Sequence, residues 1–136
     1  MAVLLDNMQL VEWLWHDADV YFLRVDWADN GEMGVSLRCE INPEEDRQTL
    51  FDLGIIEPII DIEFRDVWWL ETKIIGLGSG REVVIDWDVV HESAIINQIR
   101  TYGVSANANL LHHKIKFNSG SNIDVVFTQI WLNEVK

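Results

Sequence analysis

An alternation of apolar and polar residues with a period of two recurs along this chain and constrains its fold more than any other feature. Apolar residues occupy every second position from Tyr21 to Trp27 and again from Val35 to Ile41. The residues between them include Asp-Asn-Gly-Glu at 29–32, which favours a tight turn. Because successive strand residues point to opposite faces, the two segments predict an antiparallel hairpin with one buried face.

The strand pattern returns in the rest of the chain. Alternation from Ile60 predicts a strand that runs into residues 67–70, where two consecutive tryptophans interrupt the pattern, and residues 82–87 predict another strand. Segments 111–117 and 123–132 flank a polar turn and predict a second hairpin. The apolar residues of 123–132 change face along the segment, which a β-bulge near Val126 would explain.

Three segments carry helix signals. Asp6 begins a capping-box pattern, which predicts a short helix over 7–15. Pro43 followed by three acids predicts one or two helical turns, and apolar spacing predicts a further helix over 91–102. Helices and strands in this order indicate an α+β fold, a largely antiparallel sheet with two or three short helices. The mass of 15.8 kDa indicates one domain over 1–136.

Acidic residues are concentrated in the first two thirds of the chain. Residues 1–92 carry 21 Asp and Glu against 6 Lys and Arg, whereas residues 93–136 carry 2 against 4. The net charge of −13 repels nucleic-acid phosphates and anionic membranes and attracts cationic partners. We therefore expect neither nucleic-acid binding nor membrane binding.

Cysteine usage and the N-terminal residues bear on the cell compartment. Cys39 is the only cysteine, so no internal disulfide and no cysteine-based zinc site can be completed. The first residues lack the basic start and the continuous apolar run of a signal peptide. No apolar stretch reaches the roughly 20 residues of a membrane-spanning helix. These features predict a cytoplasmic protein, and no motif indicates a cofactor.

Histidine and carboxylates in the run Trp-His-Asp-Ala-Asp at 15–19 are the first candidates for chemistry. His16, Asp17 and Asp19, with His91, would suit a metal-dependent hydrolase, because imidazole and carboxylate groups bind divalent ions. The competing interpretation is structural. In it an aspartate caps the turn that leads into the strand, and His16 bonds to nearby backbone.

Other motifs have structural interpretations that we prefer. His112 and His113 are adjacent in a predicted strand, so His113 should face the core and His112 the solvent, and they cannot share a metal. Ser93 lacks the glycine-flanked turn of a nucleophile and suits the first turn of a helix. The glycines at 76–80 precede a strand rather than a helix, which favours a turn over a phosphate-binding loop.

Seven tryptophans in 136 residues can be core residues or binding anchors. The strand pattern places Trp27, Trp87 and Trp131 on apolar faces, where we expect core packing. Trp68 and Trp69 are consecutive, so one face of a strand cannot bury both. An exposed tryptophan flanked by carboxylates is typical of an interface anchor with an acidic rim, but helices on both faces of the sheet would bury the pair instead.

Three short motifs resemble small bacterial α+β proteins grouped among the immunity proteins of polymorphic toxin systems. They are Trp-His-Asp-Ala-Asp-Val at 15–20, Leu-Leu-His-His-Lys-Ile at 110–115 and Gly-Ser-Asn-Ile-Asp-Val-Val at 120–126. The resemblance implies a cytoplasmic protein that binds and neutralises a cognate toxin without catalysis of its own. It assigns no functional residue.

Charge and resemblance together predict a non-enzymatic interaction domain whose acidic residues face a basic protein, such as a toxin. The residues expected to contact the partner are Asp29, Glu32, Glu44, Glu45, Asp46, Asp66, Trp68 and Trp69. Two alternatives stay open. One is the metal-dependent hydrolase, and the other is a structural component that self-associates, for example as a homodimer, through a sheet edge or the tryptophans.

Overall fold

The computed structural model describes residues 2–5, 17–41, 44–75, 82–102 and 109–135, and only the backbone of residues 2 and 44–46. These residues form, in chain order, β1 (Ala2–Leu4), β2 (Asp19–Trp27), β3 (Met33–Glu40), α2 (Glu44–Asp52), β4 (Ile59–Val67), β5 (Trp69–Lys73), β6 (Glu82–Val89), α3 (Ala94–Thr101), β7 (Leu111–Phe117), β8 (Asn122–Phe127) and β9 (Gln129–Glu134). The helix predicted over 7–15 and the glycine turn predicted over 76–80 lie outside the described residues.

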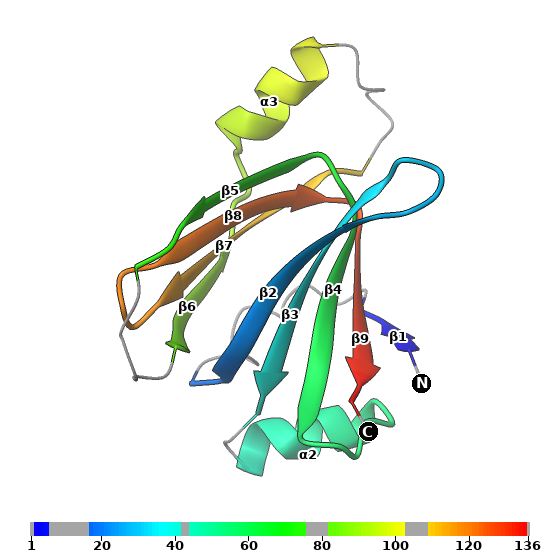
Figure 1. Cartoon of the computed structure of the whole chain (residues 1–136), viewed down its shortest axis with the longest axis vertical. Coiled ribbons are helices and arrows are strands. Elements are labelled where there is room, and N and C mark those ends of the chain that lie inside the picture. The colour runs from blue at the N-terminus through cyan, green and yellow to red at the C-terminus, as the bar shows by residue number, and fades with distance from the viewer. Residues whose placement is uncertain (1, 6–16, 42–43, 76–81, 103–108, 136) are drawn as a thin grey trace.

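Strands dominate the described part of the chain. They form one antiparallel sheet with the order β1-β9-β4-β3-β2-β6-β7-β8-β5. The two described helices, α2 and α3, lie at opposite ends of the molecule (Figure 1). The predicted antiparallel sheet is therefore confirmed, and its proportions are those of a mostly-β fold with two short helices.

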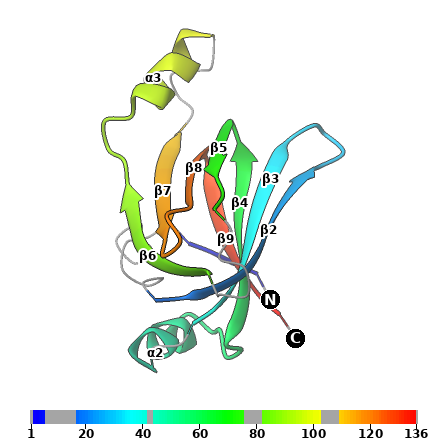
Figure 2. The same cartoon turned by 60° about the vertical axis from the view of Figure 1, so that its left-hand side comes forward.

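The sheet coils until its two halves face each other. One half contains β1, β9, β4, β3 and β2, and the other contains β6, β7, β8 and β5. Only Trp68 separates β4 from β5, and only Thr128 separates β8 from β9, so two segments of chain pass directly from one half to the other. Figure 2 shows the halves converging at their lower ends, where β2 pairs with β6.

The core fills the space between the halves. Leu37 from β3 and Ile115 from β7 are at most 1% exposed. The ring of Phe64 lies 5.9 Å from that of Trp87 and 4.8 Å from that of Phe127, so aromatic contacts join the two halves. Because each such side chain contributes roughly 1.5–3 kcal/mol when buried, these inward faces hold the coiled sheet together. Trp87 is a core residue, as predicted.

The predicted first hairpin forms between β2 and β3, in a register that runs from Asp19 opposite Glu40 to Trp27 opposite Met33. Its β3 strand buries the expected alternate residues, but β2 does not. Trp27 is 68% exposed, so its prediction as a core residue was wrong. The far end of β2 projects beyond the described strands of the opposite half of the sheet (Figure 1), and Trp27 at this end is left accessible, whereas Leu23 and Val25 pack partly against the core.

The interruption predicted at the paired tryptophans is the break between β4 and β5, whereas the prediction of one strand over 123–132 was wrong, because β8 ends at Phe127 and β9 begins at Gln129. The backbone of Asp66 adopts a φ of 53°, and the Thr128 hydroxyl donates to its carboxylate at 3.0 Å. Just beyond, the Trp68 N–H donates to the Val126 carbonyl at 2.8 Å. Both strands bend together at this point, and the break at Thr128 takes the place of the bulge predicted near Val126.

The helices follow the sequence signals closely. Leu50 in α2 is 1% exposed, as expected, but Phe51 is 60% exposed, because the next residue of a helix points about 100° away from the buried position. Helix α3 falls within the predicted 91–102. No helix of the described residues is long and apolar enough to cross a membrane.

Candidate functional site

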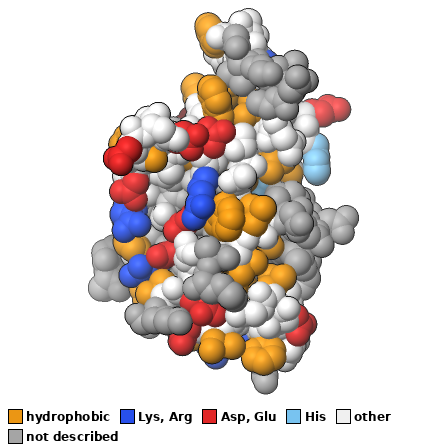
Figure 3. Space-filling model, turned by 90° about the vertical axis from the view of Figure 1, so that its right-hand side faces the viewer, with side chains coloured by type: hydrophobic (Ala, Val, Ile, Leu, Met, Phe, Trp, Pro, Cys, Tyr) orange, Lys and Arg blue, Asp and Glu red, His pale blue; other side chains and the backbone are white. Residues whose placement is uncertain are grey.

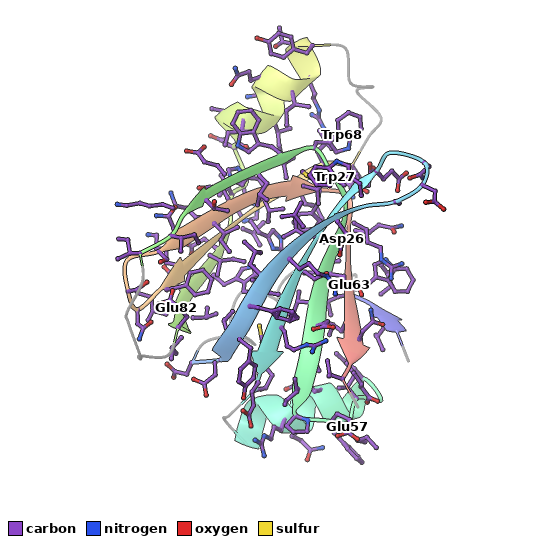
Figure 4. The ribbon with its side chains drawn as sticks, in the orientation of Figure 1. Asp26, Trp27, Glu57, Glu63, Trp68 and Glu82 are labelled. Carbon is purple, nitrogen blue, oxygen red and sulfur yellow. The ribbon has the colours of Figure 1, made fainter. Side chains whose placement is uncertain are left out.

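The end of the β2–β3 hairpin, residues 27–33, which we call the hairpin tip, brings tryptophans and carboxylates together. A cavity of about 550 Å³ lies between this tip and the β4–β5 bend. Its lining includes Trp27 and Glu32 from the tip and Asp66 and Trp68 from the bend. Figure 4 shows Trp27 and Trp68 near each other, although they come from separate parts of the sequence.

Both indole side chains are accessible at this cavity. Trp27 is 68% exposed and Trp68 is 44% exposed. Large exposed aromatic side chains that gather at one place mark interaction sites more often than isolated apolar residues do. Trp131 differs, because its half-buried ring lies on the outer face of the sheet, 4.4 Å from the guanidinium carbon of Arg65. Its prediction as a core residue was therefore wrong.

Backbone hydrogen bonds shape the hairpin tip. The Ala28 N–H donates to the Glu32 carbonyl at 2.8 Å, and the Gly31 N–H donates to the Ala28 carbonyl at 2.9 Å. The Asn30 side chain accepts from the Glu32 N–H at 3.0 Å, and Gly31 has a φ of 87°, which favours glycine. The turn is thus closed by local contacts, which set Glu32 beside Trp27.

The bend supplies the opposite wall of the cavity. Asp66 has a left-handed backbone, which is uncommon outside glycine, and its carboxylate accepts the Thr128 hydroxyl. Val67 is buried immediately after it, and Trp68 then emerges into solvent. The bend that carries the chain between the two halves of the sheet therefore also presents Trp68.

Carboxylates beside the tip are paired with arginines. Arg24 lies 2.7 Å from Asp26, and Arg65 lies 2.8 Å from Glu63. These four residues line a neighbouring groove of about 280 Å³ on the outer face of β2, β3 and β4. Figure 3 shows carboxylates and basic side chains side by side on one face of the molecule. Across the described residues, no ion pair involves the tip carboxylates Asp29 and Glu32.

The residues predicted to contact a partner fall into separate places. Asp29, Glu32, Asp66 and Trp68 lie at the hairpin tip and the bend, and Trp69 follows at the start of β5, 37% exposed. The other three belong to the first turn of α2, at the opposite end of the molecule (Figure 1). They are Glu44, Glu45 and Asp46. The eight residues of β3 separate the groups by roughly 25 Å, so one small interface cannot include both.

A serine, a histidine and an aspartate form a chain of short contacts under α3. The Ser93 hydroxyl lies 2.7 Å from His112 Nδ1, and His112 Nε2 lies 2.7 Å from an Asp124 oxygen. Ser93 also caps α3 by accepting the Ile96 N–H at 3.1 Å. Ser93 is 4% exposed and His112 is 5% exposed, so a substrate could reach the hydroxyl only if α3 moved. The arrangement fixes α3 to the sheet, in line with the structural role predicted for Ser93.

His112 was predicted to face solvent, and this was wrong. It does point away from the main core, but α3 covers that face. There Ile99 of α3 packs with Leu110 and with Val126 of β8 in a second apolar cluster. A strand pattern gives the side of the sheet, whereas burial depends on what packs over that side. The apolar face of the segment 91–102 was the sequence feature that indicated this burial, because such a face packs against another part of the protein.

His113 faces the main core, as predicted. Its Nδ1 accepts the Trp87 indole N–H at 2.9 Å, whereas its Nε2 has no hydrogen-bond partner in the described structure. Burial, with a smaller contribution from His112, lowers the pKa of His113 to about 3. The ring is therefore neutral at physiological pH and serves as part of the core.

The metal-site hypothesis is only partly covered by the structure. Asp17 has a φ of 65° at the turn before β2, and its N–H donates to the Val84 carbonyl at 2.8 Å. Asp19 is 8% exposed, and His16 lies outside the described residues. Among the residues that are described, no three His, Cys, Asp or Glu side chains gather in a metal-binding group. A site that includes His16 stays a prediction.

Comparison with known proteins gives no relative: no protein family, curated protein or solved structure matches the chain.

Proposed function

We propose that the chain is a non-enzymatic protein-interaction domain, an immunity-like inhibitor that binds a basic protein such as a toxin through the hairpin tip. The observation that carries the proposal is the cavity in which Trp27 and Trp68 meet Glu32 and Asp66. Indole faces attract guanidinium and ammonium groups, and nearby carboxylates neutralise them. An arginine or lysine side chain of the partner would occupy this cavity.

Electrostatics support a protein partner over other classes. The net charge of −13 opposes binding to nucleic acid and to anionic membranes, and it raises the rate of encounter with a basic surface. The tip and the bend each add one accessible tryptophan, Trp27 and Trp68, whose contribution to affinity depends less on salt than that of the charges does. Charge then guides the partner, and the indoles retain it.

Location and fold class belong to the same proposal. We infer a cytoplasmic protein because its single cysteine cannot form an internal disulfide. Burial raises the pKa of the Cys39 thiol above its usual range, so the thiol stays protonated and unreactive. We assign the domain to the sheet-rich members of the α+β class, as in the immunity proteins that its motifs resemble.

The test is affinity capture with matched variants. The tagged chain is used to capture partners from cells that carry its gene, and the dissociation constant of the isolated partner is measured by calorimetry. Replacing Trp27 and Trp68 by alanine should weaken binding about 30-fold or more, because buried tryptophans act as interface anchors. Phe51→Ala is the control, since Phe51 is 60% exposed at the other end of the molecule.

An inhibitor must also protect cells. Co-expression with the product of a neighbouring toxin gene should restore growth, and the double tryptophan variant should not restore it. A partner that is acidic, or one whose affinity is equally sensitive to Phe51→Ala and to the tryptophan replacements, would contradict the proposal.

Self-association is a second candidate because β5 lies at an edge of the described sheet. An edge strand offers unpaired backbone groups to another chain, and Trp69 at its start is 37% exposed. Light scattering at high concentration distinguishes the two candidates. A stable dimer that is lost in Trp69→Ala would favour self-association, and a monomer would dismiss it.

A further inference from the structure

A largely apolar cavity of the described structure, distinct from the one at the hairpin tip, opens near the pairing of β2 with β6. Among the described residues, these strands pair through Asp19 with Val83 and Val20 with Glu82. The register between β2 and β3 shifts between Val20 and Phe22, next to this pairing. The cavity has a volume of about 390 Å³, within the size range of small-molecule sites.

The cavity has an apolar floor and an apolar rim. Leu37, Phe117 and Ile123 belong to the main core and form its buried lining. Ile74 lies at the rim, where it is 65% exposed, whereas the Phe22 ring lies on the outer face of β2, 4.7 Å from the Arg38 guanidinium carbon. A ligand in this position would cover the exposed Ile74 side chain as well as fill the cavity, which favours an apolar body.

Glu82 is the one charged residue among the described lining. It lies on the same face of β6 as buried Val84, so its side chain is directed to the inside of the sheet. One carboxylate oxygen, Oε2, accepts the Ser119 hydroxyl at 2.9 Å. The other, Oε1, is buried and has no hydrogen-bond partner in the described structure. Figure 4 places Glu82 on the side of the molecule away from the hairpin tip.

The surroundings of the carboxylate are fixed by hydrogen bonds. The Ser121 hydroxyl accepts the Ile75 N–H at 2.7 Å and donates to the Ile75 carbonyl at 3.1 Å. Ser119 and Ser121 lie 2.7 Å apart, oxygen to oxygen, so the turn between β7 and β8 connects Glu82 to the rim at Ile75. These hydrogen bonds hold the Glu82 carboxylate and the backbone of Ile75 in place, which lowers the entropy cost of binding at this wall of the cavity.

A buried carboxylate oxygen without a donor is costly, and a native structure keeps one where a ligand, ion or water completes it. We propose that this cavity binds a small apolar amine, with the ammonium group donating to the Glu82 carboxylate and the hydrocarbon part lying between Ile74 and the core residues Phe117 and Ile123. The site is separate from the hairpin tip, so it does not depend on the proposed partner.

The test uses three probes of equal chain length: n-octylamine, 1-octanol and octanoate. Calorimetry should give binding of octylamine about tenfold or more tighter than that of the alcohol or the acid, because only the amine forms a charge-assisted hydrogen bond with the carboxylate. Glu82→Gln should remove this preference. Asp86→Asn is the matched control, since Asp86 lies on the same strand opposite Lys116, away from the cavity.

Nuclear Overhauser contacts locate the probe independently of the variants. They should join the octyl chain to Phe117 and Ile123, both of which line the cavity. Contacts to Trp27 or Trp68 instead would mean that the amine binds the acidic hairpin tip, and they would overturn the proposal. Absence of binding, equal binding of all three probes, or an unchanged preference in Glu82→Gln would overturn it as well.

Discussion

The hairpin tip and the α2 end are both acidic, but they lie on different kinds of element. Between the tip and the bend, Glu32 and Asp66 line a cavity with two exposed tryptophans. At the α2 end, Glu44, Glu45 and Asp46 lie in the first turn of a helix, where negative charge is favourable because backbone N–H groups there lack helical partners. Position in the helix is therefore a sufficient reason for acids at the start of α2, whereas Asp29 and Glu32 at the tip form no ion pair among the described residues.

This difference shows that a count of negative charges does not define a binding surface. The sequence places the two groups within one acidic stretch, and the coiled sheet puts them at opposite ends. Acids become a candidate site only where accessible apolar surface joins them. The comparison can be tested by changes that affect one end and leave the other intact.

The largest expected effect is at the α2 end. Leu50→Ala should lower the free energy of unfolding by about 3 kcal/mol, because it leaves a void under the helix. Leu50 is 1% exposed. Chemical denaturation measures the loss, and partner affinity per folded molecule should stay the same. A large loss of affinity in the folded variant would mean that the α2 end also takes part in binding.

Lowering the pH should destabilise the core that both ends share, through protonation of His113. The pKa of His113 is lowered to about 3 in the folded state, against about 6.5 in the unfolded state, so the unfolded chain binds the extra proton between these values. The contribution of neutral His113 to the free energy of unfolding is fully present above pH 6.5 and decreases as the pH falls toward 3. At pH 5 the loss should be about 2 kcal/mol.

Denaturation curves from pH 7 to pH 4 measure this loss. His113→Gln keeps an acceptor for the Trp87 indole and removes the titrating group, so its stability should fall less steeply than that of the wild type over this range. Equal slopes for the two proteins would refute the role given to His113.

A smaller effect is expected from charge reversal at the tip. Asp29→Lys with Glu32→Lys should reduce the association rate with a basic partner about tenfold at low salt, because accessible charge governs encounter. The difference should shrink as salt is added, and unfolding should change little. Stopped-flow mixing at two ionic strengths checks this. An association rate that is the same for the variant and the wild type at both salt concentrations would mean that the tip is not part of the interface.

The smallest effect is expected from neutralising the start of α2. Glu44→Gln with Glu45→Gln should lower the free energy of unfolding by about 1 kcal/mol, through loss of favourable charge at the helix N-terminus. Thermal unfolding at low salt is the measurement, and association with the partner is the control. If these changes slow association as much as the tip reversal does, the contrast between the two ends disappears.

The strand segments could be predicted because alternation is a local property. The β2–β3 hairpin, β6, β7 and α3 occur within or close to the predicted ranges, and Ser93 lies at the start of its helix. The sequence shows an irregularity at the paired tryptophans and a change of face within 123–132, but it does not show that the chain passes between the two halves of the sheet at Trp68 and Thr128. The exposure of Trp27 could not be predicted from the sequence either, because it depends on how far the opposite half of the sheet extends.

The candidate site was predictable only in part for the same reason. Asp66 and Trp68 were named as contacts from their order in the sequence, whereas Trp27 was assigned to the core and Glu82 was given no role, because the surroundings of both come from distant strands. The contact of Ser93 with His112 also joins residues 19 positions apart, which no spacing rule anticipates.

By itself, the sequence determined the antiparallel strands, the acidic character and the need for a single apolar core, because these follow from local periodicity and composition. Tertiary structure alone decided which tryptophans reach solvent, which carboxylates meet them and which glutamate faces a cavity. These outcomes depend on the coiling of the sheet, and coiling results from the packing of two halves against each other rather than from any one segment.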